Sequence, residues 1–307
     1  RAAQAIYYSY EENYYYFVYV NPYSGEVLKI KDVYADFFRI VLDGHFYLWL
    51  PPEIGQPLVA SFTLIFLVMV ISGLILWWPK KKKILSKSLK IKWKARWRRK
   101  NYDLHQVLGF YIMAFAAIFA ITGLVWGFVW FRDAVFFVSS GGKDYVEYYT
   151  PLSDSTVRYQ ENVPPLDAVW MKMQEMYPKA EWIEVHPPEF EHAAIAANAN
   201  PDASTYWKMD YRYFDQNTLE ELPVDHIYNR FDKASFGDKV MRINYDLHVG
   251  AIAGLPGKIL AFLLSAIIAS LPITGFLIWW GRKNKNKKVE KIGDKCQTPA
   301  GKLISNV

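Results

Sequence analysis

Three of the six histidines lie beside long apolar runs, where a chain would enter or leave a membrane. They are His45, His105 and His248. Imidazole is the commonest metal-ligating side chain, and an ionisable group at a membrane edge is costly unless it is paired or coordinated. A lone interfacial histidine that bonds a headgroup or the backbone is the ordinary alternative. Because two of the three stand in a repeated motif, we interpret the set as candidate metal ligands.

The apolar runs predict three membrane-spanning helices. They cover residues 57–78, 107–131 and 259–280, contain no charged side chain, and each reaches the roughly 20 residues that a bilayer crossing needs. A purely soluble protein is therefore excluded. The net charge of +6 does not indicate binding to nucleic acid, because Lys and Arg cluster beside the runs instead of forming a basic face.

Basic residues beside the runs predict the orientation of the chain. The loop before His105 holds many Lys and Arg and a single acid, Asp103, so the positive-inside rule assigns it to the cytoplasm. The C-terminal tail is also basic, and tryptophan pairs at 77–78 and 279–280 mark the same inner interface. The predicted order is a terminal hairpin of a truncated domain (1–32), an external interfacial helix (33–56), a span (57–78), a basic cytoplasmic loop (79–104), a span (105–131), an external α+β domain with its connection (132–257), a span (258–281) and a basic cytoplasmic tail (282–307).

Two hairpins of similar design indicate a duplication outside the membrane. Residues 14–30 alternate apolar and polar side chains around an Asn-Pro-Tyr-Ser-Gly turn, which predicts a β-hairpin. Residues 206–222 repeat this design at the end of a small α+β unit. The expected elements of that unit are a helix from Pro164 and Pro165 through Tyr177 and strands near 181–187, 191–198 and 205–213. Because the first hairpin lacks the rest of such a unit, we expect an upstream segment with a further transmembrane helix.

A second repeat lies at the membrane. The sequence Asn-Tyr-Asp-Leu-His occurs at 101–105 and again at 244–248. A small residue followed by glycine occurs in every span, as Ser72-Gly73, Thr122-Gly123 and Thr274-Gly275. Small residues let another helix or a flat cofactor approach the backbone closely. Plain helix packing is the alternative for each glycine taken singly.

The predicted topology sorts the histidines into two layers. His45 and His248 both lie outside, at nearly the same spacing from the next tryptophan pair, so we expect them to share one iron. His105 lies at the inner face, and its partner is expected on the missing first helix. The 18 residues from His105 to Gly123 rise about 27 Å in a helix, which brings this glycine to the depth of the outer pair.

Histidine pairs at opposite faces of a helical bundle are the arrangement of two low-spin b-type haems that pass electrons across a membrane. Gly73 and Gly275 lie at the predicted level of His105, where a porphyrin face needs clearance. The single cysteine, Cys296, excludes a disulfide framework, and no CxxCH sequence is present for covalent haem attachment. We therefore expect haem b, in two copies, with the inner one dependent on the missing helix.

These features resemble the PepSY-associated transmembrane helix family, whose extramembrane parts are PepSY domains. The resemblance rests on YYFVYVNPYSGEVL, PLDAVWMKMQEMYPKAEWIEVHPP, NYDLHQVLGF with ITGLVW, and NYDLHVGAIAGLPGKIL with ITGFLIWW, in this order. It implies a membrane α-helical bundle, with three spans visible and a fourth missing at the N-terminus, and an external α+β PepSY-like module. The family's Leu-His motifs correspond to His105 and His248, whereas Gly44 precedes His45 in place of leucine.

Some members of this family are inner-membrane haem proteins that reduce ferric siderophores during iron uptake. The resemblance therefore implies a haem-dependent ferric-siderophore reductase of the bacterial inner membrane, with its large domain in the periplasm. Its electrons would come from a quinol or a cytoplasmic reductase. The alternative is a membrane-anchored PepSY protein that binds or regulates a peptide or protease, without redox activity.

Metal-ion transport is a third interpretation, but the spans contain no acidic residue that would support an ion pathway. His186 and His192 lie near several glutamates in the external domain. We interpret this cluster as a solvated strand edge, with metal binding as the alternative.

Overall fold

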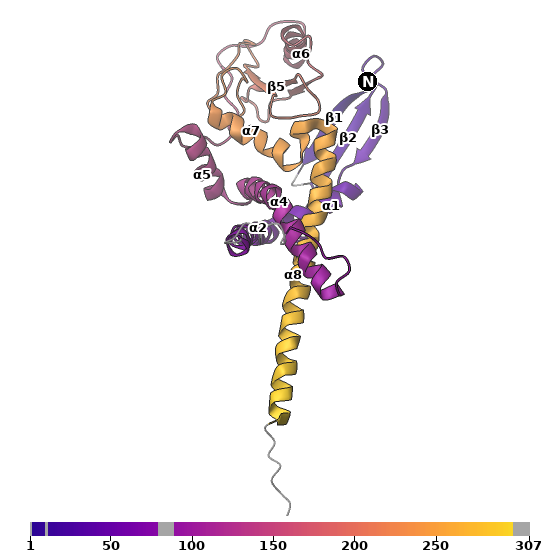
Figure 1. The fold of residues 1–307 in the computed structure, drawn as a ribbon. Helices are drawn as coiled ribbons and strands as arrows, with labels where there is room; N and C mark the ends of the chain where they lie inside the picture. Colours follow the sequence, from indigo (N-terminus) through magenta and orange to yellow (C-terminus); the bar gives the residue numbers. More distant parts are fainter. Residues whose placement is uncertain (1, 10–11, 79–88, 297–307) are drawn as a thin grey trace, which may run out of the picture.

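Three long apolar helices form the membrane part of the structure. The computed structural model describes residues 2–9, 12–78 and 89–296, and within these ranges three helices are long and apolar enough to cross a bilayer. They are α2 (Pro52–Trp77), α4 (Trp97–Gly127) and α8 (Gly254–Cys296). α4 packs against both α2 and α8 (Figure 1). The three predicted spans are confirmed.

The side chains of these helices are poorly covered by protein. Only 11% of the most apolar window of α2 and 6% of that of α8 are buried, against 33% for α4. Apolar surface of this extent has to meet lipid, because a helix satisfies its own backbone hydrogen bonds in hydrocarbon while its side chains avoid water. The chain is therefore a multi-pass membrane protein with α4 as its central helix.

The first two spans begin earlier than predicted. α2 starts at Pro52 and so takes residues 52–56 from the predicted interfacial segment, because proline suits a first helical turn, where its missing N–H costs no hydrogen bond. α4 starts at Trp97, which places His105 two turns inside the helix. It ends at Gly127, before an extended residue, and a separate helix, α5 (Val129–Ser140), takes the end of the predicted span.

Both basic segments are partly helical, against the prediction of a loop at 79–104 and a tail from 282. The last part of the loop belongs to α4, and α8 continues to Cys296. Lys and Arg have high helix propensity, so a cluster of them does not end a helix. The parts of these predictions that concern residues 79–88 and 297–307 lie outside the described residues.

The N-terminal sheet has three antiparallel strands, one more than the predicted hairpin. They follow in the order β1 (Ala3–Ser9), β2 (Tyr14–Val20) and β3 (Val27–Asp32). Gly25 has a φ of 73° in the turn between β2 and β3, a left-handed angle that glycine adopts without steric cost. Helix α1 (Phe37–Tyr47) follows, with Asp36 as its N-cap, and ends where Leu48 turns left-handed.

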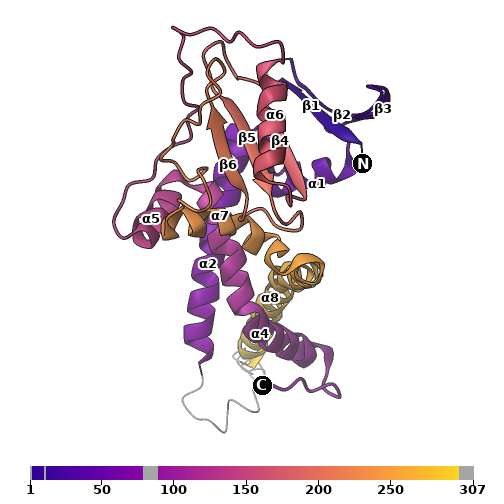
Figure 2. The same cartoon turned by 90° about the horizontal axis from the view of Figure 1, so that it is seen from above.

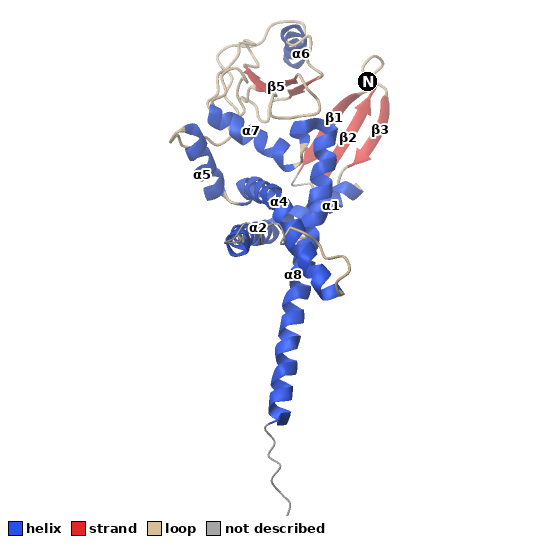
Figure 3. Cartoon of the chain, in the orientation of Figure 1, coloured by secondary structure: helices blue, strands red, loops and turns tan. Residues whose placement is uncertain are grey.

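The α+β module (residues 151–229) is built on a second three-stranded antiparallel sheet. Its elements are α6 (Pro165–Met176), β4 (Trp182–His186), β5 (Ile195–Asn200) and β6 (Asp210–Phe214), with sheet order β4-β5-β6 (Figure 2). Helix α6 lies beside β5 (Figure 3). Val169 and Met173 of α6 pack on Ile195, Ala197 and Phe214. The predicted helix is confirmed, but the second and third strands begin later than predicted because their first residues form turns. In the repeated hairpin at 206–222, β6 meets the returning chain only at an isolated bridge between Phe214 and Glu221, so the duplication stays a prediction.

Helix α7 (Phe236–His248) lies in the stretch that sequence reasoning left as a connection. Ser235 and Asp238 form a capping box at its start. It packs against α4 and α5 and lies between the α+β module and α4 (Figures 1 and 2). The 3-10 turn η1 (Ala251–Ala253) joins it to α8. The last residue of α7 is the candidate ligand His248, so this helix positions it.

Candidate histidine site

His45 and His248 lie side by side although they are far apart in the sequence. Their ring centroids are 6.0 Å apart, and the ring planes are inclined by 47°. A metal–imidazole bond is about 2 Å long and the ring centre lies roughly 1 Å behind the nitrogen, so two imidazoles on opposite sides of one metal have centroids about 6 Å apart. The structure thus brings together the two histidines that the topology paired, at a separation that fits a shared metal.

The imidazole of His248 is held in one tautomer by Thr122. Its Nδ1 lies 2.8 Å from the Thr122 Oγ1. The threonine hydroxyl donates its single proton to the Ile118 carbonyl at 2.7 Å, so its oxygen accepts the imidazole N–H. His248 therefore carries its proton on Nδ1, and Nε2 keeps a free lone pair. Hydrogen bonds of this kind fix the tautomer and orientation of metal-ligating histidines.

His105 repeats this arrangement at the other end of α4. Its Nδ1 lies 2.8 Å from Oγ1 of Thr274 on α8. That hydroxyl donates to the carbonyls of Ser270 and Leu271, at 3.1 and 3.0 Å, so it too accepts from the imidazole. The same tautomer follows, with the Nε2 of His105 free as a ligand.

Buried asparagines complete both contacts. The Nδ2 of Asn244 donates to the carbonyl oxygen of Thr122 at 3.1 Å, and that of Asn101 donates to the carbonyl oxygen of Thr274 at 3.0 Å. In each copy of the repeated motif, asparagine and histidine thus hold the same threonine by its carbonyl and its hydroxyl. Sequence reasoning missed this role, for which the signal was the recurrence of asparagine and threonine as well as histidine.

Glycines stand beside both oriented rings. A Cβ added to Gly123 would lie 3.4 Å from Cε1 of His248, and one added to Gly275 would lie 3.3 Å from Cε1 of His105. A methyl group at Gly123 would just touch the His248 ring, whereas one at Gly275 would press slightly on the His105 ring. A Cβ on the third predicted glycine, Gly73, would have no described atom within 4 Å, so the clearance predicted there stays a prediction.

The motif aspartates fasten the histidine-bearing helices to segments outside the apolar runs. Asp103 accepts a hydrogen bond from the backbone N–H of Lys92 at 3.1 Å. Asp246 accepts from the backbone N–H groups of Tyr206, at 3.1 Å, and Trp207, at 2.7 Å. Each aspartate is buried and lies two residues before the candidate histidine ligand. Its hydrogen bonds therefore fix the helical turn on which that histidine lies.

A degenerate third copy of the motif surrounds His45. Arg39 and Asp43 form an ion pair of 3.0 Å just before it. The same Arg-x3-Asp-x-His spacing occurs at 99–105 and 242–248. This spacing is the sequence signal that relates His45 to the other two histidines, although leucine is absent before it.

The two threonine–histidine contacts lie at different levels. His105 and Thr122 are 17 residues apart in α4, which corresponds to roughly 25 Å along the helix. Trp77, at the end of α2, packs on Phe110 with ring centroids 4.3 Å apart, so α2 also ends near His105. The predicted separation into two layers agrees with these contacts.

The remaining histidines belong to the α+β module. The Nε2 of His186 lies 3.2 Å from the Asn198 amide and 3.5 Å from Glu184. Among the described residues, no group of three or more His, Cys, Asp and Glu side chains is arranged to hold a metal ion. His186, the last residue of β4, and His192, in the turn before β5, are both exposed, and the interpretation of this cluster as a solvated strand edge stays a prediction.

His226 is buried and makes the stability of the module depend on pH. Its Nε2 donates to the Tyr149 carbonyl at 3.0 Å, and its Nδ1 accepts from the backbone N–H of Tyr228 at 3.2 Å, which requires the neutral ring. Burial lowers the pKa of His226. Because the unfolded chain then binds a proton more readily, we expect the stability to be full above about pH 6.5 and to fall below it, by at most about 1.4 kcal/mol per pH unit.

Urea unfolding of the module between pH 7.5 and 5, followed by circular dichroism, measures this effect. His226→Gln places an amide donor near the Nε2 position, facing the Tyr149 carbonyl, and does not titrate. The difference between wild type and this variant should therefore grow as the pH falls, and a difference that is constant with pH would contradict the assignment.

Comparison with known proteins agrees with this architecture. The sequence matches the family described as the PepSY-associated TM region over residues 1–282. No curated protein matches it. The matched range includes both sheets, α2, α4, the apolar part of α8 and all the histidines discussed above. The chain therefore belongs to the PepSY-associated transmembrane family.

Proposed function

We propose that the protein is a b-type haem protein of the bacterial inner membrane that moves electrons across the bilayer and reduces a ferric siderophore on the periplasmic side. One observation carries the proposal. At both levels of α4 a threonine accepts the Nδ1–H of a histidine, which leaves Nε2 as a ligand, and at one level a second imidazole stands at the right separation. A histidine with a purely structural role needs no such orientation.

Each residue has a defined role in this proposal. His45 and His248 would hold the outer haem, and His105 would help to hold the inner one. Gly123 and Gly275 leave room beside the rings, while Thr122 and Thr274 hold the tautomer. Haem b, when bound, supplies one-electron redox chemistry, and the protein sets the position and the potential through these ligands and their burial.

The substrate and the donor complete the proposed reaction. One electron converts the bound Fe(III) to Fe(II), which hard oxygen ligands hold less tightly. No side chain has to donate or accept a proton in this step. The basic segments around α4 and α8 support a cytoplasmic location for the His105 end, and hence a donor that is a quinol or a cytoplasmic reductase.

An absorption spectrum tests the proposal. Protein purified from haem-replete cells should show a Soret band and reduced α bands, and the reduced bands should decay when a ferric siderophore is added. Protein without these bands would sink the proposal and favour a binding or regulatory role of the PepSY type.

Thr122→Val is expected to weaken haem binding at the outer site by about 10- to 100-fold, because removal of a hydrogen bond to a metal-ligating histidine has effects of that size. Thr122→Ser retains the hydroxyl and should behave as wild type. Haem titration of the apoprotein measures both.

Thr63→Val is the matched control, because Thr63 lies in α2 and donates to the carbonyl of Val59 without a histidine partner. If Thr63→Val and Thr122→Val weaken haem binding equally, the orienting role of Thr122 is wrong.

A further inference from the structure

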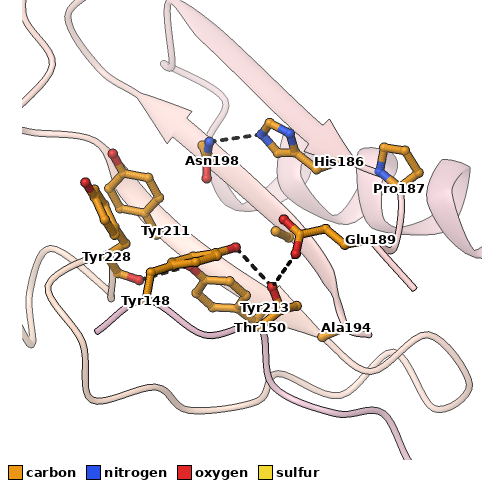
Figure 4. A pocket seen from close by; sticks show the side chains of 11 residues that line it. Tyr148, Thr150, His186, Pro187, Glu189, Ala194, Asn198, Tyr211, Tyr213 and Tyr228 are labelled. Carbon is orange, nitrogen blue, oxygen red and sulfur yellow. Dashed lines mark hydrogen bonds between the residues drawn. The ribbon is translucent and has the colours of Figure 1, made fainter. Parts of the chain in front are cut away.

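The sheet of the α+β module has a pocket on the face that α6 does not cover. Side chains alternate along β5, so Ile195, Ala197 and Ala199 pack towards α6 while the residues between them point to the other face. The cavity there measures about 120 Å³, which is smaller than the usual drug-sized sites of about 300–1,000 Å³ and suits a ligand of only a few heavy atoms. Its lining is Tyr148, Thr150, His186, Pro187, Glu189, Ala194, Ala196, Asn198, Tyr211, Tyr213 and Tyr228 (Figure 4).

Four tyrosine rings form the walls of this pocket over a floor of alanine. The rings of Tyr211 and Tyr228 are 5.2 Å apart in an edge-to-face arrangement, and those of Tyr148 and Tyr228 are 6.1 Å apart. Burial raises the pKa of Tyr211 and Tyr213, so the phenols stay neutral. Neutral aromatic faces carry a negative electrostatic potential and attract cations.

The acidic groups at the rim of the pocket also attract cations. Glu189 is exposed and accepts a hydrogen bond from Thr150, whose hydroxyl contacts that of Tyr148 at 3.1 Å (Figure 4). Glu184 lies next to His186 at the other side. None of the lining residues is Lys or Arg. Arg242 donates to three backbone carbonyls and its guanidinium, which stays charged, lies 5.3 Å over the Tyr211 ring. A ligand cation therefore has to use the rings of Tyr148 and Tyr228 more than that of Tyr211.

We propose that this pocket binds the primary alkylammonium group of a small molecule. The tyrosine faces stabilise the positive charge, and Glu189 accepts an N–H that a quaternary ammonium lacks. The alanine floor leaves room for the alkyl chain. This site is separate from His45, His105 and His248 and does not depend on haem.

Calorimetric titration of the full chain with n-butylammonium tests the proposal. Saturable binding is expected with a dissociation constant of about 1–10 mM. n-Butanol and butyrate have the same chain without the positive charge and should bind at least about tenfold more weakly. Tetramethylammonium should also bind more weakly than n-butylammonium, because it cannot donate to Glu189. Absence of n-butylammonium binding, or equal binding of n-butanol, overturns the proposal.

Three substitutions locate the ligand. Tyr228→Phe keeps the aromatic face and should preserve the affinity, whereas Tyr228→Leu should weaken it about tenfold. The hydrogen bonds of Tyr228 in the structure are made by its backbone, so both variants retain them. Glu189→Gln should weaken the affinity by a similar factor, while Glu175→Gln, on α6 at the opposite face, should leave it unchanged. If Tyr228→Leu, Tyr228→Phe and Glu189→Gln all bind n-butylammonium with the same affinity, the amine binds elsewhere.

Discussion

Replacing either His45 or His248 by alanine is expected to abolish one and the same b-type haem signal, whereas His105→Ala should leave that signal intact. The physical reason is the 6.0 Å separation of the first two rings and the position of the third near the other end of α4. A low-spin haem loses its spectrum when one of two axial imidazoles is removed. Reduced-minus-oxidised spectra of the three variants measure the effect.

His192→Ala is the control for this series, because His192 is an exposed residue of the α+β module. It should retain every haem band. The two-level assignment is wrong if all three candidate variants lose one common signal, or if His45→Ala and His248→Ala lose different ones.

Arg242→Ala is expected to destabilise the α+β module by about 3–5 kcal/mol, since it leaves several buried acceptors without a donor. Arg242 is 7% exposed, and its guanidinium donates to the carbonyls of Ile227, Met209 and Asn229 at 2.6, 3.2 and 2.5 Å. These bonds tie α7 to the module. Because His248 ends that helix, the outer haem should be lost together with the stability.

Urea unfolding followed by near-ultraviolet circular dichroism measures the loss, and the haem spectrum reports on the site. Arg230→Ala is the matched control. Arg230 pairs with Asp232 at the surface, where removal of an ion pair costs about 0–1 kcal/mol. A loss below about 1 kcal/mol in Arg242→Ala would show that its carbonyl bonds do not hold α7 in place.

Periodicity and hydropathy are local properties, and they predicted the local elements well. The three spans, the first hairpin and helix α6 lie where their residue patterns indicated. Element ends were less well predicted. α4 extends eight residues ahead of the predicted start of its span, at His105, because charged residues form good helix when tertiary contacts anchor them, as Asp103 does through Lys92. Helix α7 was missed because its polar sequence becomes helical through its capping box and its packing.

The sequence by itself determined that the chain crosses a membrane, that His45, His105 and His248 lie near the apolar runs, and that Gly123 and Gly275 recur in matching positions. Only the tertiary structure decided which threonine each histidine meets. Thr122 lies far from His248 in the chain, and the Oγ1–Nδ1 contact exists because α7 crosses the end of α4. The tautomer of the ring depends on that contact, and no residue pattern specifies a hydrogen bond between segments so distant in the chain.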